Sequence, residues 1–386
     1  MTVWDSLIGQ DAIVDELAHA VSDPDAMTHA WLITGPPGSG RSTAAAAFAA
    51  ALQCPDGGCG VCSVCQAARA GSHPDVDLVR SETLSYGVDD AEELIRRASV
   101  VPADAPWHIV VIEDGDRLTP EAANMLLKVV EEPPPHLVWL LCAPSPEDVL
   151  PTIRSRTRGV HLRTPSTGEV AEALHDRYGV DPAMAAFAAR ASQGHIGRAR
   201  ALATDDEARR RRQDVLRIPG GLRDLASCFA AAEQLLAMAT EDAASITDEL
   251  DATEEESLLR AYGSGAEGLT KARFDKMSER ALKDLRKMQA SRRKRAVRDQ
   301  LDRALVDLTT YYRDVLVLQL DAGVPLVNDE MRTQIGQEAS ASTATDTARR
   351  LEAIERGRLA VQANGGLPLV LEGMFVEVKD PLVRVR

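Results

Sequence analysis

A glycine-rich octapeptide, Gly35-Pro36-Pro37-Gly38-Ser39-Gly40-Arg41-Ser42, lies between an apolar run that ends at Thr34 and an alanine-rich run that starts at Thr43. This order predicts a strand, a tight turn and the start of a helix. It is typical of a P-loop, in which backbone N–H groups surround a phosphate and the helix N-terminus adds the positive end of its dipole. The pattern Gly-x4-Gly-Lys-Ser/Thr is met except at one position, because Arg41 replaces the lysine.

The replacement at Arg41 affects the chemistry of this loop more than its shape. Lysine brings a compact charge to the terminal phosphates, whereas the planar guanidinium of arginine is larger and occupies a different place. The sequence therefore predicts that a nucleotide, ATP or ADP, binds weakly, binds without turnover, or does not bind, with Mg²⁺ present only together with nucleotide. The loop residues of this candidate site are Gly35, Gly38, Ser39, Gly40, Arg41, Ser42 and Thr43.

An acidic pair, Glu113-Asp114, follows the apolar run Ile109-Val110-Val111-Ile112. In active nucleotidases of this kind the first acid helps to hold magnesium and the second orients the attacking water. Here the order is Glu then Asp, so the predicted catalytic acid, Asp114, is one carbon shorter than usual. A displacement on the order of 1 Å can cost about a hundredfold in rate. Like the replacement at Arg41, this change therefore predicts that the chain's own nucleotide site is impaired.

Short apolar runs alternate with helical patterns between Ala30 and Arg163. We expect strands over residues 30–34, 76–79, 108–112 and 137–142 and near 160, and helices over 88–101 and 120–130. This alternation predicts an α/β domain whose parallel sheet carries helices on both faces. Its site is expected at the carboxyl ends of the strands.

Four of the six cysteines fall directly after the predicted P-loop helix, at Cys54, Cys59, Cys62 and Cys65. A tetrahedral zinc site explains four thiols at this spacing better than disulfides do, because a cytoplasmic compartment disfavours disulfides. An iron–sulfur cluster is the rival, but its bacterial run needs a fourth cysteine where Arg69 stands. We expect structural Zn²⁺ that ties down a small surface knob.

The length and composition of the chain limit the classes of protein to which it can belong. A chain of 386 residues with 45% hydrophobic residues is expected to form two or three globular domains. The net charge of −15 argues against sequence-blind binding of a polyanion by the chain alone, and 4% aromatic residues argue against stacking platforms for single strands. Neither a membrane span nor a signal peptide is predicted, so the expected location is cytoplasmic.

The second half of the sequence is helical in pattern. Residues 241–256 are acidic and residues 271–298 are basic, with a glycine-containing break at 263–268, which suggests an antiparallel helix pair. The arginine runs Arg209 to Arg212 and Arg292 to Arg295 fit either nucleic-acid binding or, as we favour, a solvated helix face. Further core helices are expected at 304–320 and 351–376, the latter broken at 364–368.

Taken together, these segments resemble those of the AAA+ clamp-loader family. The matching segments are Ile8-Gly9-Gln10, Gly35 to Ser42, the four cysteines, His73-Pro74-Asp75, Leu126 to Pro134 and Ser155-Arg156. The resemblance implies a P-loop domain over residues 1–164, with the zinc module at 54–65, and a helical lid over 165–208. It also implies an all-α collar for oligomerisation over 209–386, with a charged helical insertion at about 240–298.

The resemblance implies a role for Arg156. In the family a Ser-Arg-Cys segment carries an arginine finger that reaches in trans into the ATP site of a neighbouring subunit, and the matching residues here are Ser155-Arg156-Thr157. Such a finger offsets charge on the phosphoryl group in transition, an effect of about three to five orders of magnitude in rate. The alternative is that Arg156 is a solvated surface arginine.

Three departures from the active members of the family fall in the chain's own nucleotide site. They are Arg41, the inverted pair Glu113-Asp114, and Ala143-Pro144 in the place of a polar residue that senses phosphate. The phosphate-sensing arginine of the lid aligns near Gly197, one residue from Arg198, so neither is assigned that role. The resemblance therefore implies a non-motor, stator subunit without ATPase activity of its own.

The implied function is the loading of a sliding clamp onto primer–template DNA in DNA replication, within the DNA polymerase III holoenzyme, a nucleotidyltransferase. The implied partners are motor subunits of the gamma/tau type and a delta subunit in a five-membered ring, the clamp, and DNA through the complex, but no membrane. One alternative is an active ATPase motor subunit of the same loader, with Asp114 orienting the water. Another is a zinc-dependent interaction module with a vestigial nucleotide fold.

Overall fold

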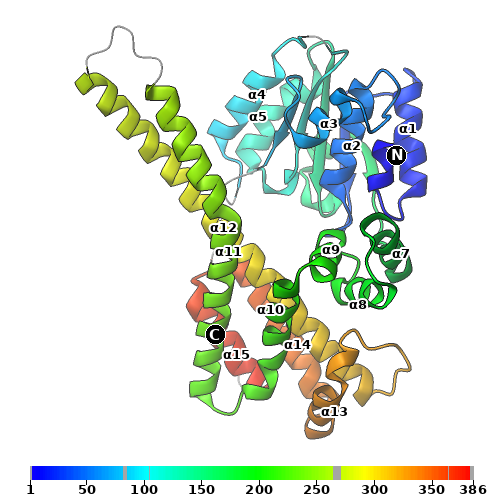
Figure 1. Cartoon of the computed structure of the whole chain (residues 1–386), viewed down its shortest axis with the longest axis vertical. Helices are drawn as coiled ribbons and strands as arrows, with labels where there is room; N and C mark the ends of the chain where they lie inside the picture. The colour runs from blue at the N-terminus through cyan, green and yellow to red at the C-terminus, as the bar shows by residue number, and fades with distance from the viewer. Residues whose placement is uncertain (1, 81–84, 104, 264–270, 364, 383–386) are drawn as a thin grey trace. The chain divides into compact units, whose positions relative to one another are not determined.

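The computed structural model describes residues 2–80, 85–103, 105–263, 271–363 and 365–382. The chain divides into two compact units, Met1–Thr204 and Asp205–Arg386. The first unit is α/β and the second is built of helices (Figure 1). No helix in the described part of the chain is both long and apolar enough to cross a bilayer.

The first unit contains a five-stranded sheet in the order β2-β3-β4-β1-β5. The strands are β1 (Ala30–Thr34), β2 (Val76–Val79), β3 (His108–Ile112), β4 (Leu137–Ala143) and β5 (Arg158–His161). Every pairing is parallel, which confirms the predicted parallel sheet. Every residue of β1, β3 and β4 is buried, as expected of strands that are covered on both faces.

A separate hydrophobic core covers each of the two faces of this sheet. Trp31 and Ile33 of β1 point into one core, and Ala30 and Leu32 point into the other, as the two-residue period of a strand requires. The first core includes α1 (Asp11–Ser22), α2 (Arg41–Gln53) and α3 (Ser63–Ala70). The second includes α4 (Val88–Ala98), α5 (Pro120–Glu131) and α6 (Pro151–Arg154). Helix α4 ends three residues earlier than the predicted 88–101.

Three short helices complete the first unit: α7 (Thr167–Tyr178), α8 (Pro182–Ser192) and α9 (Ile196–Thr204). Ser166 and Glu169 form a capping box at the start of α7, and the Asp181 carboxylate accepts backbone hydrogen bonds at the start of α8. Short 3-10 helices also occur: η1 (Val3–Ser6), η2 (Gly115–Arg117) and η3 (Pro146–Asp148) in this unit, and η4 (Pro219–Gly221) and η5 (Asp329–Met331) in the second.

The second unit consists of helices around one core. They are α10 (Asp206–Arg217), α11 (Leu225–Gly263), α12 (Lys271–Gln319), α13 (Arg332–Ala341), α14 (Ala344–Gln362) and α15 (Leu367–Lys379). The predicted core helix at 304–320 is the C-terminal part of α12 rather than a helix of its own. The predicted break at 263–268 begins where α11 ends, but residues 264–270 lie outside the described residues, as does Asn364 in the predicted break between α14 and α15.

The predicted antiparallel helix pair is confirmed. The ion pairs Glu255–Arg286 and Asp248–Arg293 join α11 to α12, and the residue number rises along one helix as it falls along the other. The pair extends beyond the other helices of its unit (Figure 1), and the core of the unit reaches no further along these helices than Ala243 and Ala296. We call residues 246–260 of α11 and 279–296 of α12 the arm.

The arginine runs form the solvated faces that we favoured only in part: Arg210, Arg293 and Lys294 are exposed, whereas Arg212 and Arg292 are not. Arg212 is 4% exposed and binds Asp307, Glu330 and Asn328, which ties α10 to α12, to η5 and to the N-cap of η5. Arg292 is held by Asp251 and Glu254 across the arm. Arg212 and Arg292 therefore contribute to the internal structure of the second unit, because carboxylates from other elements pair with them.

Arg292 is expected to matter for the stability of the arm. Its side chain is 15% exposed, and Arg292→Ala would leave Asp251 and Glu254, which are themselves partly buried, without their partner. A loss of about 1–3 kcal/mol is expected because a desolvated charge keeps its burial cost when its partner is removed. Amide hydrogen exchange over the arm should become faster, whereas Lys294→Ala, at an exposed neighbour, should leave exchange unchanged. Equal exchange in both variants would contradict the structural role.

Candidate functional site

The carboxyl ends of the parallel strands gather the predicted nucleotide-site residues at one edge of the sheet. The glycine-rich loop follows β1, Glu113 and Asp114 follow β3, and Pro144 follows β4. Pro144 contributes a carbonyl that accepts a hydrogen bond from the Gly35 N–H at 3.2 Å. The glycine-rich loop therefore contacts the segment after β4, and the acidic pair follows the neighbouring strand β3 at the same edge of the sheet.

The glycine-rich loop has the backbone of a tight turn before a helix. Gly38 and Gly40 have φ of +83° and +96°, values that a residue with a Cβ rarely adopts. Gly40 is the N-cap of α2, and its carbonyl accepts from Ala44 at 2.8 Å. The turn therefore presents the helix N-terminus toward the edge of the sheet, as a phosphate-binding loop does. Ser42 and Thr43 lie in the first turn of α2.

The charged side chains of this site are engaged with the protein itself. The Arg41 guanidinium donates to the Gly35 carbonyl at 2.8 Å, so it folds back onto the loop. Glu113, whose side chain is 12% exposed, accepts from Arg80 at 2.6 Å. This hydrogen bond raises the pKa of Arg80, which stays cationic. The acid predicted to hold magnesium is thus neutralised by an arginine from the end of β2.

The segment before α9 covers the glycine-rich loop. The Ile196 N–H donates to the Gly38 carbonyl at 3.2 Å. A Cβ added to Gly38 would lie 2.2 Å from Cγ of His195, so the imidazole rests directly on the loop backbone.

A second set of contacts fixes the position of α7. The Gln10 amide donates to the Arg163 carbonyl at 2.7 Å and accepts from the Arg163 N–H at 3.2 Å. The Arg163 guanidinium pairs with Glu169, and hydrogen bonds from Arg163 and Ser166 lower the pKa of Glu169 to about 2. Glu169 also lies against Gly9, where an added Cβ would meet it at 2.9 Å. The helices after β5 are therefore joined to the sheet domain at two places.

Arg156 lies at the surface, between α6 and β5, and its guanidinium is oriented. It pairs with Glu131 at the end of α5 at 2.6 Å and donates to the Thr152 carbonyl at 2.8 Å. Its side chain is 38% exposed. Arg156 does not join the other predicted site residues through any contact that the structure describes.

The four cysteines converge. Their sulfur atoms all lie within 4.8 Å of one another, and Cys54 Sγ is 3.8 Å from both Cys59 Sγ and Cys62 Sγ. A tetrahedron with metal–sulfur bonds of about 2.3 Å has sulfur–sulfur edges of about 3.8 Å, so the cluster has the size of a zinc–thiolate site. The loop between the cysteines turns through Gly57, Gly58 and Gly60, all with positive φ.

The cluster is less of a surface knob than the sequence suggested. Cys54 caps the end of α2 and Cys65 lies in α3, and both are buried in the first core with Val3. Burial opposes ionisation of Cys54, but hydrogen bonds from the backbone of Cys59, Gly58 and Asp56 outweigh it and lower the pKa of this thiol to about 6. Burial, together with the neighbouring thiols Cys54 and Cys62, raises the pKa of Cys65 to about 12. The opposite shifts of Cys54 and Cys65 show that the thiols of the cluster are close enough to influence one another's ionisation.

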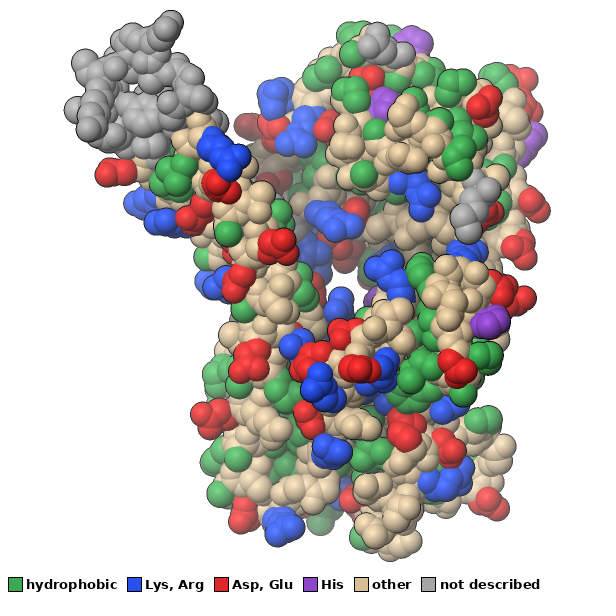
Figure 2. Space-filling view, in the orientation of Figure 1, with side chains coloured by type: hydrophobic (Ala, Val, Ile, Leu, Met, Phe, Trp, Pro, Cys, Tyr) green, Lys and Arg blue, Asp and Glu red, His purple; other side chains and the backbone are tan. Residues whose placement is uncertain are grey.

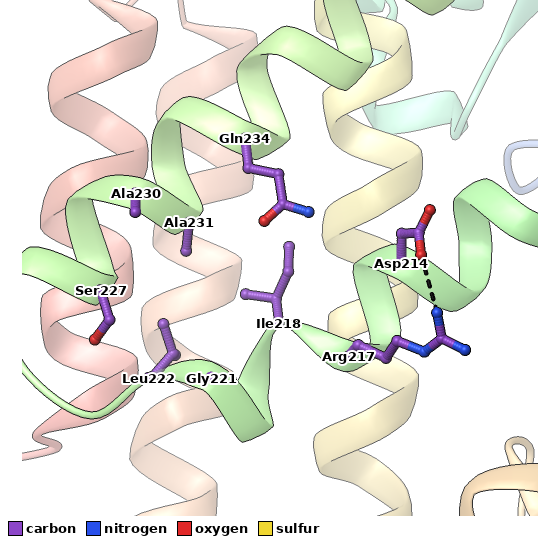
Figure 3. Close-up of a pocket in the computed structure, with 9 residues that line it drawn as sticks. All are labelled: Asp214, Arg217, Ile218, Gly221, Leu222, Ser227, Ala230, Ala231 and Gln234. Carbon is purple, nitrogen blue, oxygen red and sulfur yellow. Dashed lines mark hydrogen bonds and ion pairs between the residues drawn. The ribbon is translucent and has the colours of Figure 1, made fainter.

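The second unit has a separate hollow of about 270 Å³ (Figure 3). Ile218, Leu222 and Ala231 give it an apolar lining, and Arg217 pairs with Asp214 at 3.2 Å at one end. It shares no residue with the predicted nucleotide or metal sites. The two cysteines outside the cluster are both buried: Cys228 in the core of this second unit and Cys142 in β4 of the first.

A parallel sheet with a glycine-rich turn before a helix and an acidic pair at the same edge is the arrangement of a P-loop fold. Residues 9–166 match the family model described as DNA polymerase III, delta subunit. A DNA polymerase III subunit delta' of Bacillus subtilis is 28% identical over 218 residues, which are 56% of this chain and 66% of that protein. The first unit is therefore similar in sequence to clamp-loader subunits of DNA polymerase III.

Other relatives match the same region. DNA polymerase III subunit gamma/tau of Mycobacterium tuberculosis is 36% identical over 162 residues, 41% of this chain, but the chain spans only 28% of that relative's length. Among solved structures, a DNA polymerase III gamma subunit-related protein of Thermotoga maritima gives a TM-score of 0.41 at 15% identity and covers 95% of this chain and 98% of that one. The RuvB protein of the same organism gives 0.40 at 19% identity over 55% of this chain and 65% of that one.

Two contributors to the site were not identified from the sequence. Arg80 follows a short strand and matches no motif, so only the β2–β3 register, which sets Val79 beside Ile112, reveals that it reaches Glu113. His195 lies in a segment whose alignment drew attention only to Gly197 and Arg198. A search for residues at the carboxyl end of every strand could have found Arg80, but no local signal points to His195.

Proposed function

We propose that the chain is the non-motor, delta-prime subunit of a DNA polymerase III clamp loader. In this role it binds a neighbouring motor subunit and supplies Arg156 to that subunit's ATP, while the loader opens a sliding clamp and sets it on primer–template DNA. Residues 165–208 act as the lid and residues 209–386 as the collar that holds the ring together. The chain does not hydrolyse ATP itself.

One observation carries this proposal: the groups that would act on nucleotide are already bonded within the chain. Arg41 is bonded to Gly35, Glu113 is paired with Arg80, and His195 covers Gly38. A nucleotide bound here would have to break the Arg80–Glu113 pair before magnesium could use the carboxylate. Arg156, in contrast, lies at the surface with a guanidinium that two contacts orient.

The competing function is that of an active motor subunit, and the 36% identity to a gamma/tau protein favours it. That identity is confined to 162 residues, whereas the likeness to a delta' protein extends over 218 residues. ATP binding and hydrolysis by the isolated full chain separate the two functions, because a motor subunit must turn over nucleotide through its own acidic pair.

We expect no ATP turnover by the isolated chain. Arg41→Lys alone should not create it, because Arg80 still neutralises Glu113. Arg41→Lys combined with Arg80→Ala frees both groups and should strengthen nucleotide binding, measured by fluorescence of a labelled ATP analogue. Turnover by the wild-type chain that Asp114→Asn abolishes would replace this proposal with the motor function.

We also propose that Cys54, Cys59, Cys62 and Cys65 hold one structural zinc ion. The donor set fits, since four thiolates close a tetrahedral site and leave no position for a substrate. The distances between the sulfur atoms also support zinc. A metal held between α2 and α3 would join the P-loop helix to the segment that leads into β2.

A further inference from the structure

Residues 2–10 begin at the cysteine cluster, and we call them the strap. The Val3 N–H donates to the Gly58 carbonyl at 3.0 Å, and the Val3 side chain is fully buried in the first core. A Cβ added to Gly58 would lie 2.7 Å from Cγ2 of Val3, and the φ of +104° at Gly58 is one that L side chains rarely adopt. The Gly58 N–H also donates to Cys54. One residue of the cysteine loop therefore contacts both a proposed metal ligand and the start of the strap.

The strap ends at the segment that leads into α7. Gln10 is 3% exposed, and its amide bonds both the carbonyl and the N–H of Arg163. Between the two ends of the strap, Leu7 and Ile8 are buried. Arg163 in turn pairs with Glu169 in the first turn of α7. The strap therefore connects the cysteine cluster to α7 through contacts that the chain itself supplies.

The helix that follows the strap, α1, has an anchor of its own. Leu17 and Ala20 are buried in the first core, whereas Asp11 and Asp15 are exposed. Figure 2 shows acidic side chains along the edge of the first unit where α1 lies in Figure 1. Because its apolar face packs on the core, this amphipathic helix is expected to stay in place when the strap moves.

The loop that holds Val3, residues 54–59, offers little apolar surface to keep it ordered. Its residues 55–57 are exposed, and Gly57 and Gly58 both have positive φ. Glycine loses more conformational freedom than any other residue when it is ordered. Metal–thiolate bonds at both ends of the loop would offset that loss. The carbonyl that bonds Val3 is therefore expected to stay in place only while the metal is bound.

We propose that the strap couples metal binding at the cysteine cluster to the local opening of α7. With metal bound, Val3 stays docked and Gln10 holds Arg163. Without metal, Val3 leaves the core and the strap detaches, so the Arg163 N–H and carbonyl lose their partner and α7 opens more readily. The inference rests on the zinc ion proposed above for the four cysteines, and it gives that ion a consequence beyond the stability of the fold.

The test measures amide hydrogen exchange of the full chain before and after a chelator removes zinc, with the released zinc quantified by a zinc-binding dye. Exchange over residues 2–8 and over α7 should become about tenfold or more faster, because local opening then costs less free energy. A low concentration of urea should leave these rates unchanged, whereas it accelerates exchange by global unfolding, which β3 and β4 report. Exchange in α14, in the second unit, should not respond to zinc.

The outcomes separate the metal site from the strap. Purified chain that releases no zinc would refute both the metal site and the coupling. Chain that releases zinc while the strap or α7 keeps its protection would overturn the coupling and leave the metal site standing. The same holds if the strap and α7 accelerate only as much as β3 and β4 do, with the same dependence on urea.

Two variants loosen one end of the strap each while zinc stays bound. Gln10→Ala removes only the contact with Arg163, so α7 should exchange faster while residues 2–8 keep their protection. Val3→Ser loosens the other end and should accelerate both. Gln66→Ala is the matched control, because Gln66 is exposed in α3 and also donates to a backbone carbonyl, at 3.1 Å. Wild-type protection of α7 in the zinc-loaded Gln10 and Val3 variants would overturn the coupling.

Discussion

Arg156→Ala is expected to lower ATP hydrolysis at one site of an assembled clamp loader by about 10³–10⁵-fold. The affected site is the one on the motor subunit beside this chain. The guanidinium would offset charge that develops on the phosphoryl group only in the transition state, so kcat should fall while nucleotide affinity changes little. A loader in which only that motor subunit is catalytically active gives the clearest measurement.

Arg154→Ala is the matched control for this prediction. Arg154 lies two residues earlier with a similar exposure, 42% against 38%, and its guanidinium also bonds a backbone carbonyl, that of Pro146. Loss of the exposed Arg156–Glu131 pair should cost stability little, since such pairs contribute about 0–1 kcal/mol. Both variants should therefore assemble normally. Equal ATPase rates in the two variants would contradict the assignment of Arg156 as an arginine finger.

The sheet could be predicted from the sequence because its strands are buried on both faces. Runs such as Ile109-Val110-Val111-Ile112 are apolar without alternation, and turn residues and helical patterns bound them. Element ends were predicted less well. Helix α4 ends at Ala98, where Ser99 caps it, although Val100 and Val101 continue the apolar pattern. Both valines are exposed, so hydrophobic character alone did not identify the end of the helix.

The parts of the candidate site that form from residues close in sequence could be predicted. The contacts between residues far apart in sequence could not. Gly35 to Ser42 and the four cysteines are close in sequence, and their spacing restricts the geometry that they can adopt. The contacts that close the nucleotide site join residues far apart: Arg80 reaches Glu113 across 33 positions, and Gly38 meets His195. The altered residue Arg41 suggested an impaired site, but only the fold reveals which partners engage it.

The helix pair of α11 and α12 illustrates the same limit. Opposite charges on consecutive helical runs correctly predicted an antiparallel pair. The sequence did not distinguish inward from outward positions, because that depends on the rotation of α12 about its axis. Arg292 and Lys294, two residues apart, therefore differ completely in their surroundings: one binds Asp251 and Glu254, and the other is exposed.

Removal of the proposed zinc should destabilise the first unit strongly. Metal binding contributes about 10–16 kcal/mol in zinc-finger peptides, which have almost no other core. Here the first core also contains large buried side chains such as Trp31 and Phe48, so we expect a smaller loss of several kcal/mol and a fall in Tm on the order of 10 °C. Purified chain should contain about one zinc ion, and a brown colour would favour an iron–sulfur cluster instead.

Cys62→Ser isolates the contribution of the metal. Cys62 is only partly buried and is the N-cap of α3, a position that serine fills well, so the substitution keeps the helix start and changes packing little. Any large loss of stability must then come from the lost thiolate ligand. Cys228→Ala, in the core of the other unit, should leave the zinc content unchanged. Cys62→Ser chain that keeps both its zinc and its Tm would exclude a four-thiolate site, because three sulfurs and a hydroxyl bind zinc far more weakly than four thiolates do.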